Sequence, residues 1–276
     1  MKIIAETTTL YSPKDGKKHG LTIIPSCTII NGEVYRDFED IDSEEFINKI
    51  AEGAVPTTSQ PAVGEIIDVF EESDEEILFL PIGDGLSGTY QTAVGAKNCM
   101  EKNGHIHILD TKTLAGPQRY LVQKALELRE KGYTIEKIKE ELVHRIESSV
   151  SFVIPKDFEF LRRSGRLTSV AAKVATMIKI VPVLTQTEDK KRITLFSVKR
   201  SKRKAVDALI NHLKEIGVNE NYFVTVSHAG DKEEAQSICA KLKEHFTGAV
   251  PEIFKLPPSL ITHGGPGCIV IQAIRR

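Results

Sequence analysis

The feature that most constrains the fold is the alternation of short apolar runs with amphipathic segments along the first half of the chain. KIIA, LTIIP, CTII and ILFLPI have the length and composition of strands. Between them, DSEEFINKIAEG and AVGEIIDVFEES place apolar residues three and four positions apart, as helices do. Strands that alternate with helices predict parallel βαβ units, and therefore an α/β fold with a mainly parallel sheet.

The pattern changes near residue 150. SFVIP is followed by the basic stretch DFEFLRRSGRL and then by the apolar runs IKIVPVL and RITLF, which only a short polar turn separates. Two strands so close in sequence predict antiparallel pairing and a mixed sheet. Since 276 residues suit two domains of ordinary size, we predict two three-layer α/β/α domains at 1–150 and 151–276.

The composition predicts a cytoplasmic protein without stable membrane insertion. No stretch approaches the roughly 20 apolar residues that span a bilayer, and MKIIAETTTLYS lacks the apolar core of a signal peptide. The four cysteines, Cys27, Cys99, Cys239 and Cys268, form no C-x-x-C pair and have no histidine at zinc-ligand spacing. We therefore expect reduced thiols, with no disulfide, metal or cofactor.

The net charge of −1 hides a charge asymmetry, because residues 155–210 carry +9 and the remainder −10. Such a basic segment serves phosphates, an acidic partner or nucleic acid, or it is simply a set of solvated helix faces. The chain has no helix-turn-helix, zinc-finger or RNP signature and no tryptophan. Nucleic acid is therefore not an expected partner.

The glycine-rich run GDGLSG at residues 83–88 has the G-x-G-x-x-G spacing between a predicted strand and a predicted helix. Asp110 ends the next predicted strand, about where a ribose-binding acid stands in dinucleotide sites. Glycines let an anion approach the backbone, and a helix amino terminus supplies amide donors. These features suit a pyrophosphate, but they suit a carboxylate equally well.

Ser87 lies in the same turn and has two further interpretations. As a hydrolase nucleophile it needs glycines two positions to either side, and Thr89 stands where the second should be. As a structural residue, it caps the helix that follows. An acyl hydrolase or transferase that pairs Ser87 with His263 remains an alternative.

Two other segments carry candidate anion-binding side chains. PTTSQP, interpreted as a loop, supplies the hydroxyls of residues 57–59, and hydroxyl loops are mostly local turn and capping devices. His263 lies in the predicted loop PPSLITHGGPG, whose glycines leave space around the imidazole. LRRSGRL contributes Arg162, Arg163 and Arg166, and arginines bind planar anions well.

These motifs occur in an order that resembles the DegV family across nearly the whole chain. The ordered segments are PTTSQP, LSGTYQTA, LDTKTLAG, FEFLRRSGRL and THGGPG. One departure concerns the end of the first strand, where Glu6 and Thr7 replace the Asp-Ser pair frequent in the family.

The resemblance implies a long-chain fatty acid, such as palmitate, in an apolar tunnel, with hydroxyl groups and the late histidine around its carboxylate. Carried onto this sequence, the ligand-binding residues are Thr58, Ser59, Ser87, Gly88, His263 and Gly264. Some family members are fatty-acid-binding subunits of a bacterial fatty acid kinase, in which a separate kinase makes an acyl phosphate for phospholipid synthesis. In those members the arginine equivalent to Arg166 is implicated in docking the kinase. The resemblance therefore implies a lipid-binding carrier rather than an enzyme.

Overall fold

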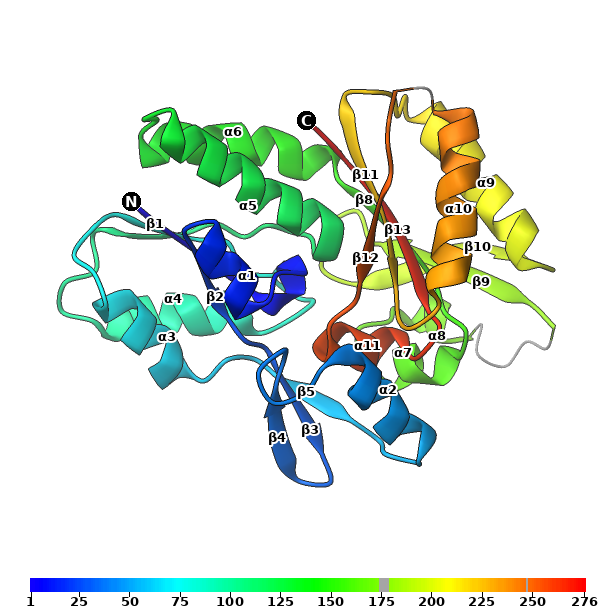
Figure 1. Ribbon diagram of the computed structural model, residues 1–276, viewed down its shortest axis with the longest axis horizontal. Helices are drawn as coiled ribbons and strands as arrows, with labels where there is room; N and C mark the ends of the chain where they lie inside the picture. Colours follow the sequence, from blue (N-terminus) through cyan, green and yellow to red (C-terminus); the bar gives the residue numbers. More distant parts are fainter. Residues whose placement is uncertain (174–178, 247) are drawn as a thin grey trace.

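The first sheet has four parallel strands in the order β2-β1-β6-β7; Figure 1 labels two of them, β1 and β2. The strands are β1 (Lys2–Glu6), β2 (Leu21–Ile24), β6 (Ile77–Phe79) and β7 (Ile106–Ile108). The computed structural model describes residues 1–173, 179–246 and 248–276.

The second sheet has six strands in the order β10-β9-β8-β13-β11-β12. They are β8 (Val150–Ile154), β9 (Val181–Gln186), β10 (Ile193–Lys199), β11 (Tyr222–His228), β12 (Glu252–Lys255) and β13 (Ile269–Arg275). β11 and β12 run parallel, whereas the other neighbouring pairs are antiparallel. The predicted α/β class, with a parallel first sheet and a mixed second sheet, is confirmed. Ile178 of the predicted run IKIVPVL lies outside the described residues.

Helices cover both faces of each sheet, and one helical layer is shared. α3 (Val63–Glu71) and α4 (Thr89–Cys99) pack on one face of the first sheet. α9 (Lys202–Glu215) and α10 (Lys232–His245) pack on the outer face of the second.

The shared layer consists of α5 (Ala115–Glu130) and α6 (Ile135–Ser148), whose apolar residues join a core that also includes Ile3 of β1 and Phe223 of β11. The strands of the first sheet all precede residue 109, and those of the second all follow residue 149. Because the shared helices contact both sheets, the division at 150 stays a prediction.

The predicted PTTSQP loop is wrong at residues 57–59, which form strand β5 (Thr57–Ser59). β5 pairs with β3 (Cys27–Ile30), which also pairs with β4 (Glu33–Arg36), in a separate antiparallel sheet. Its two threonines are β-branched and suit a pleated strand, and β3 offers them a free edge. CTII therefore lies outside the parallel sheet that the alternating pattern predicts.

The predicted loop PPSLITHGGPG is also wrong in part, since α11 (Pro258–Gly264) occupies most of it. Pro258 stands in the first turn, where a missing N–H costs no helical hydrogen bond. Gly265 ends the helix with a φ of 78°, a backbone conformation that favours glycine. His263 therefore lies in the last turn of a helix that is buried at most of its positions.

The shorter elements complete the chain. They are the 3-10 turn η1 (Thr7–Thr9), α1 (Pro13–Lys18), α2 (Ser43–Ala51), α7 (Phe158–Arg163) and α8 (Ser169–Ala172). Because α7 ends at Arg163, Arg166 lies beyond the helix rather than on its face.

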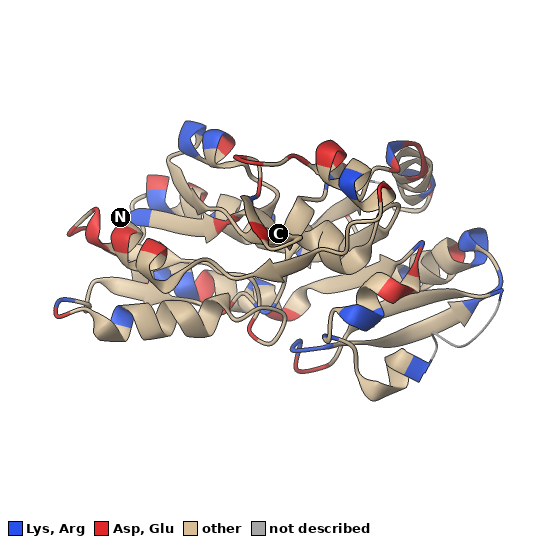
Figure 2. Cartoon of the chain, turned by 90° about the horizontal axis from the view of Figure 1, so that it is seen from below, with Lys and Arg blue, Asp and Glu red and all other residues tan. Residues whose placement is uncertain are grey.

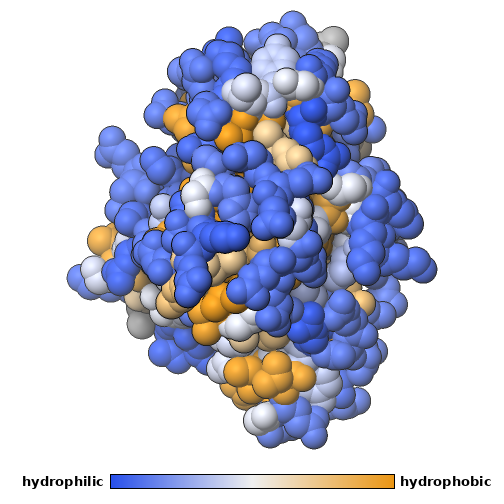
Figure 3. Space-filling model, turned by 90° about the vertical axis from the view of Figure 1, so that its left-hand side faces the viewer, coloured by the Kyte–Doolittle hydropathy of each residue, from blue (hydrophilic) through white to orange (hydrophobic). Residues whose placement is uncertain are grey.

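The surface is polar over most of the view in Figure 3, with small separate hydrophobic patches. In Figure 2, Lys and Arg lie among Asp and Glu over much of the chain, and ion pairs neutralise part of the basic segment. Examples are Arg162 with Glu159 and Lys191 with Asp84. No helix in the described part of the chain is long and apolar enough to cross a membrane.

Candidate functional site

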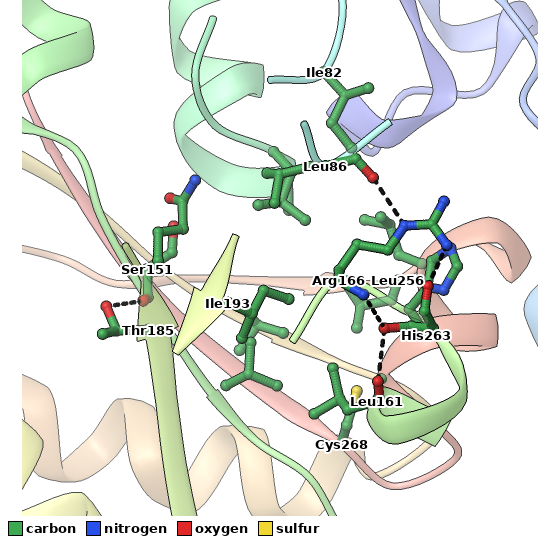
Figure 4. A pocket seen from close by; sticks show the side chains of 18 residues that line it. Ile82, Leu86, Ser151, Leu161, Arg166, Thr185, Ile193, Leu256, His263 and Cys268 are labelled. Atoms are coloured by element: carbon green, nitrogen blue, oxygen red, sulfur yellow. Dashed lines mark hydrogen bonds between the residues drawn. The ribbon is translucent and has the colours of Figure 1, made fainter. Parts of the chain in front are cut away.

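An elongated apolar cavity lies where the two sheets and the short helix α11 meet (Figure 4). It encloses about 780 Å³ of space between the atoms, including its open mouth. Arg166 and His263 lie at one end, and Ser151 and Thr185 lie at the other. The aliphatic lining includes Ile82, Leu86, Leu114, Val153, Leu161, Ile193, Leu256, Leu260 and Val270.

The polar side chains of this cavity direct their hydrogen bonds into the protein. The hydroxyl of Thr185 donates to the carbonyl of Ser151 at 2.9 Å, and the hydroxyl oxygen of Ser151 accepts from Gln272 at 2.8 Å. The amide nitrogen of Gln186 donates to the carbonyls of Lys112 and Lys190. The wall therefore presents few unsatisfied groups to a ligand, which suits an alkyl chain.

A second, polar cavity, with about 470 Å³ of space including its opening to solvent, adjoins the apolar one. Five residues line both cavities, namely Ile82, Leu86, Arg166, Leu260 and His263. The polar cavity lies beyond the carboxyl ends of β1 and β6, the two strands between which the connections of the first sheet change direction. Ligands bind at such switch points in open α/β sheets. Together the two cavities form an apolar channel with a polar end.

Of the predicted ligand residues, Thr58, Ser59, Ser87 and His263 come together in the polar cavity. Thr58 Oγ1 lies 3.0 Å from His263 Nε2. Burial and, to a lesser extent, the charge of Arg166 together lower the pKa of His263 to about 3. The imidazole is therefore neutral at physiological pH, and it offers one N–H donor.

Ser87 belongs to a chain of hydroxyl groups at the amino terminus of α4. Its oxygen lies 3.0 Å from Thr89 Oγ1 and accepts the backbone N–H of Thr89 at 3.3 Å. The Thr89 hydroxyl donates to the carboxylate of Glu6 at 3.3 Å. Gly88 is the N-cap residue of α4, so the prediction that Ser87 caps this helix is wrong, although Ser87 accepts the N–H of the first helical residue and lines the cavity.

Arg166 lies at the junction of the two cavities. Its side chain donates to the carbonyl oxygens of Leu86 and Ser164, and burial lowers its pKa. Within residues 1–173, 179–246 and 248–276, no carboxylate forms an ion pair with it. A half-buried guanidinium without a counter-ion leaves positive charge available to an anion.

The predicted glycines occupy positions where a side chain would collide. A Cβ atom at Gly88 would lie 2.3 Å from Oε1 of Gln60, and one at Gly264 would lie 2.5 Å from Sγ of Cys268. Gly264 lines the apolar cavity, whereas Gly88 is the N-cap residue of α4, beside Ser87.

The GDGLSG run packs against the protein itself. A Cβ atom at Gly83 would lie 2.8 Å from the backbone of Lys112, and one at Gly85 the same distance from Lys191. The carboxylate of Asp110 accepts the backbone N–H groups of Asp84 and Lys112. The loop and its acidic residue are thus engaged internally, which counts against the dinucleotide alternative.

Two buried carboxyl groups behind the hydroxyls were not among the predicted site residues. Glu6 lines the polar cavity, and Asp37 accepts from Thr7 at 3.0 Å and from the Ser259 hydroxyl at 2.5 Å. Burial raises the pKa of each to about 7. The sequence holds one signal for Glu6, an acidic residue directly after an apolar strand of a parallel sheet.

The fold and the two cavities define an α/β protein with an internal apolar cavity beside a polar one. The model of the DegV family, a family of uncharacterised proteins, matches residues 1–276. The chain therefore belongs to the DegV family. Curated relatives include the DegV domain-containing protein YteA of Lactococcus lactis, which is 29% identical over 100% of this chain and 98% of its own. A DegV domain-containing protein of Staphylococcus aureus strain COL is 30% identical over 99% of this chain and 97% of its own.

Solved structures of the family superpose over the whole chain. DegV of Bacillus subtilis, described as a fatty acid binding protein, gives a TM-score of 0.88 at 26% identity and covers 100% of this chain and 99% of its own. A DegV family protein of Thermus thermophilus, described by its fatty acid binding, gives 0.89 at 25% identity with the same coverage. A stearic acid-binding protein of Eubacterium ventriosum gives 0.87 at 24% identity and covers 99% and 98% of the two chains.

Proposed function

We propose that this protein binds a long-chain fatty acid, with the alkyl chain in the apolar cavity and the carboxylate in the polar one. The observation that carries the proposal is that the apolar and polar cavities lie side by side and share lining residues, Arg166 and His263 among them. A neutral histidine and three hydroxyl groups supply hydrogen-bond donors to the carboxylate. Two relatives of 25–26% identity are described as binding fatty acids, which supports a fatty acid as the ligand of this protein.

Tail and head group contribute different terms to binding. Burying a methylene stabilises by about 0.8 kcal/mol, so about fourteen methylenes of palmitate give roughly 11 kcal/mol before the cost of ordering the chain. A carboxylate taken from water must regain its hydrogen bonds, and Thr58, Ser59, Ser87 and His263 line the space in which it would do so. The tail then sets the affinity, and the head group sets the orientation.

The role that we propose for the bound acid is that of a co-substrate. A partner fatty acid kinase phosphorylates the presented carboxylate, and the acyl phosphate feeds phospholipid synthesis. Arg166 docks the kinase, together with exposed basic residues of the segment 155–210. The protein itself is a carrier without catalytic residues, and its four free cysteines suit a reducing cytoplasm.

The bond pattern around Ser87 disfavours the hydrolase alternative. His263 Nε2 contacts Thr58, and the Ser87 hydroxyl contacts Thr89, so the observed bonds do not join a nucleophile to a base. A fluorophosphonate probe is expected to leave Ser87 unlabelled. Labelling of Ser87 that disappears in His263→Ala would establish a hydrolase instead.

Native mass spectrometry of freshly purified protein tests the ligand class directly. We expect a co-purified mass of a long-chain fatty acid, which organic extraction removes and added palmitate restores. Palmitate should also raise the melting temperature of the extracted protein, since a ligand bound only to the folded state stabilises it. Extracted protein whose melting temperature is unchanged by palmitate contradicts the proposal.

A further inference from the structure

A buried carboxyl group lines the polar cavity. Glu6, the last residue of β1, is 1% exposed and lines this cavity together with Ser26 and Ser87. Its Oε1 accepts the backbone N–H of Ile82 at 2.8 Å. Its Oε2 accepts from the hydroxyls of Ser26 at 3.1 Å and Thr89 at 3.3 Å. In the described part of the chain it forms no ion pair with a Lys or Arg side chain.

The protonation state of Glu6 decides in which direction the hydroxyl chain points. Each hydroxyl has a single hydrogen. When Glu6 is ionised, the Thr89 hydrogen points to Oε2, and the free lone pair of Thr89 attracts the Ser87 hydrogen from 3.0 Å away. Ser87 is then turned away from a ligand.

A proton on Oε2 reverses this chain. The carboxyl group donates to Thr89, Thr89 donates to Ser87, and the Ser87 hydrogen is left for a ligand oxygen. If the proton is directed to Ser26 instead, the Ser26 hydrogen is released toward the same cavity. In both cases a neutral Glu6 adds one donor to the polar cavity, whereas an ionised Glu6 withdraws one.

The charges around the cavity favour the neutral form when an acid is bound. Burial raises the pKa of Glu6 to about 7, against the opposing effect of its hydrogen bonds. The facing ionisable groups are the buried carboxyl of Asp37, the guanidinium of Arg166 and the neutral imidazole of His263. A ligand carboxylate adds a second negative charge to a space of low polarity, and two such charges disfavour joint ionisation.

We propose that Glu6 is a positioning residue of the head-group site, which takes up a proton when a carboxylic acid ligand binds and thereby aims the Ser87 hydroxyl at the ligand carboxylate. This inference depends on the proposed function. The proton comes from solvent, and no covalent bond forms or breaks.

Two substitutions separate the proton from the shape of the side chain. In Glu6→Gln the amide oxygen still accepts from Ile82 and the amide nitrogen donates to Thr89, as the protonated acid does. Glu6→Leu keeps a similar volume without either bond. Glu72→Gln is the matched control, because Glu72 is an exposed carboxylate that pairs with Lys2 at the end of α3.

The experiment is calorimetric titration of extracted protein with monomeric palmitate at pH 7, 8 and 9. From pH 7 to pH 9 we expect the affinity of the wild type to fall by about fifty-fold relative to Glu6→Gln, given a pKa of about 7 for the free protein. At pH 8, in buffers of different ionisation enthalpy, the wild type should take up nearly one proton more than Glu6→Gln. Palmitate's own change of protonation contributes equally to both proteins, so it drops out when the proton uptake of Glu6→Gln is subtracted from that of the wild type.

Glu6→Leu should bind at least tenfold more weakly than Glu6→Gln at pH 7, and Glu72→Gln should match the wild type. Equal proton uptake by the wild type and Glu6→Gln overturns the inference, and so does a Glu6→Gln variant as weak as Glu6→Leu. Both outcomes leave fatty acid binding intact. Failure of the wild type to bind palmitate at any pH overturns the proposed function itself, and the inference with it.

Discussion

Thr58 Oγ1 lies 3.0 Å from His263 Nε2, although the two residues are 205 positions apart in the chain. The contact joins the small antiparallel sheet to the last turn of α11, which also contacts β3 and β5. Asp37 holds the amino-terminal end of α11 through Ser259. Residues from both ends of the chain thus fix the polar end of the channel.

Thr58→Val should weaken palmitate binding by about five- to tenfold, because it removes a hydroxyl group near the carboxylate while conserving shape and strand propensity. This loss corresponds to about 1 kcal/mol, typical of one hydrogen bond. Calorimetry of extracted protein measures it. Thr57→Val is the control, since the neighbouring Thr57 is exposed and faces the other side of β5. Equal effects of the two substitutions would contradict the assignment of Thr58.

Arg166→Gln should leave palmitate affinity within about threefold of the wild type and lower acyl phosphate formation at least tenfold. The proposed docking role predicts this separation of binding from turnover. Acyl phosphate made by a bacterial fatty acid kinase and ATP can be trapped with hydroxylamine and counted. Arg162→Gln is the control, because its guanidinium is exposed and pairs with Glu159. Loss of affinity with unchanged turnover of bound acid would make Arg166 a carboxylate ligand instead.

Val153→Phe should shorten the apolar cavity and reduce palmitate affinity at least tenfold, with a smaller effect on octanoate. Val153 lines the cavity from β8. Val150→Phe on the same strand is the matched control, because Val150 packs against the core that α9 and α10 cover. Competition with a fluorescent fatty acid measures both ligands. A Val153→Phe variant that binds palmitate as the wild type does would exclude the alkyl chain from this cavity.

Asp37 makes the stability of the protein dependent on pH. Burial raises the pKa of this carboxyl from 3.8 to about 7, so the folded state retains the proton longer than the unfolded state does. The contribution of Asp37 to the free energy of unfolding is therefore fully present below about pH 4, and it is lost as the pH rises through 7. Relative to Asp37→Asn, the wild type should lose on the order of 4 kcal/mol between pH 4 and pH 8. Urea unfolding at several pH values tests this, and parallel curves for the two proteins would contradict it.

The strands and helices that carry strong periodicity could be predicted from the chain. ILFLPI is uniformly apolar, and DSEEFINKIAEG repeats apolar residues at helical spacing. Short elements were missed, because three hydroxyl residues at 57–59 or seven residues at 258–264 give too few positions for a period to emerge. These two short elements depend on contacts with distant parts of the chain. β5 pairs with β3, and the amino-terminal end of α11 is hydrogen-bonded to Asp37.

The sequence by itself determined the α/β class, the parallel first sheet and mixed second sheet, and membership of a family whose ordered motifs span the chain. Only the tertiary structure placed the hydroxyls of β5, the imidazole of α11 and the guanidinium of Arg166 around one polar cavity. The tertiary structure also placed the carboxyl group of Glu6 in the lining of the same polar cavity. Periodicity records which face of an element is buried, but proximity between distant residues and the desolvation that shifts a pKa arise only when those faces pack together.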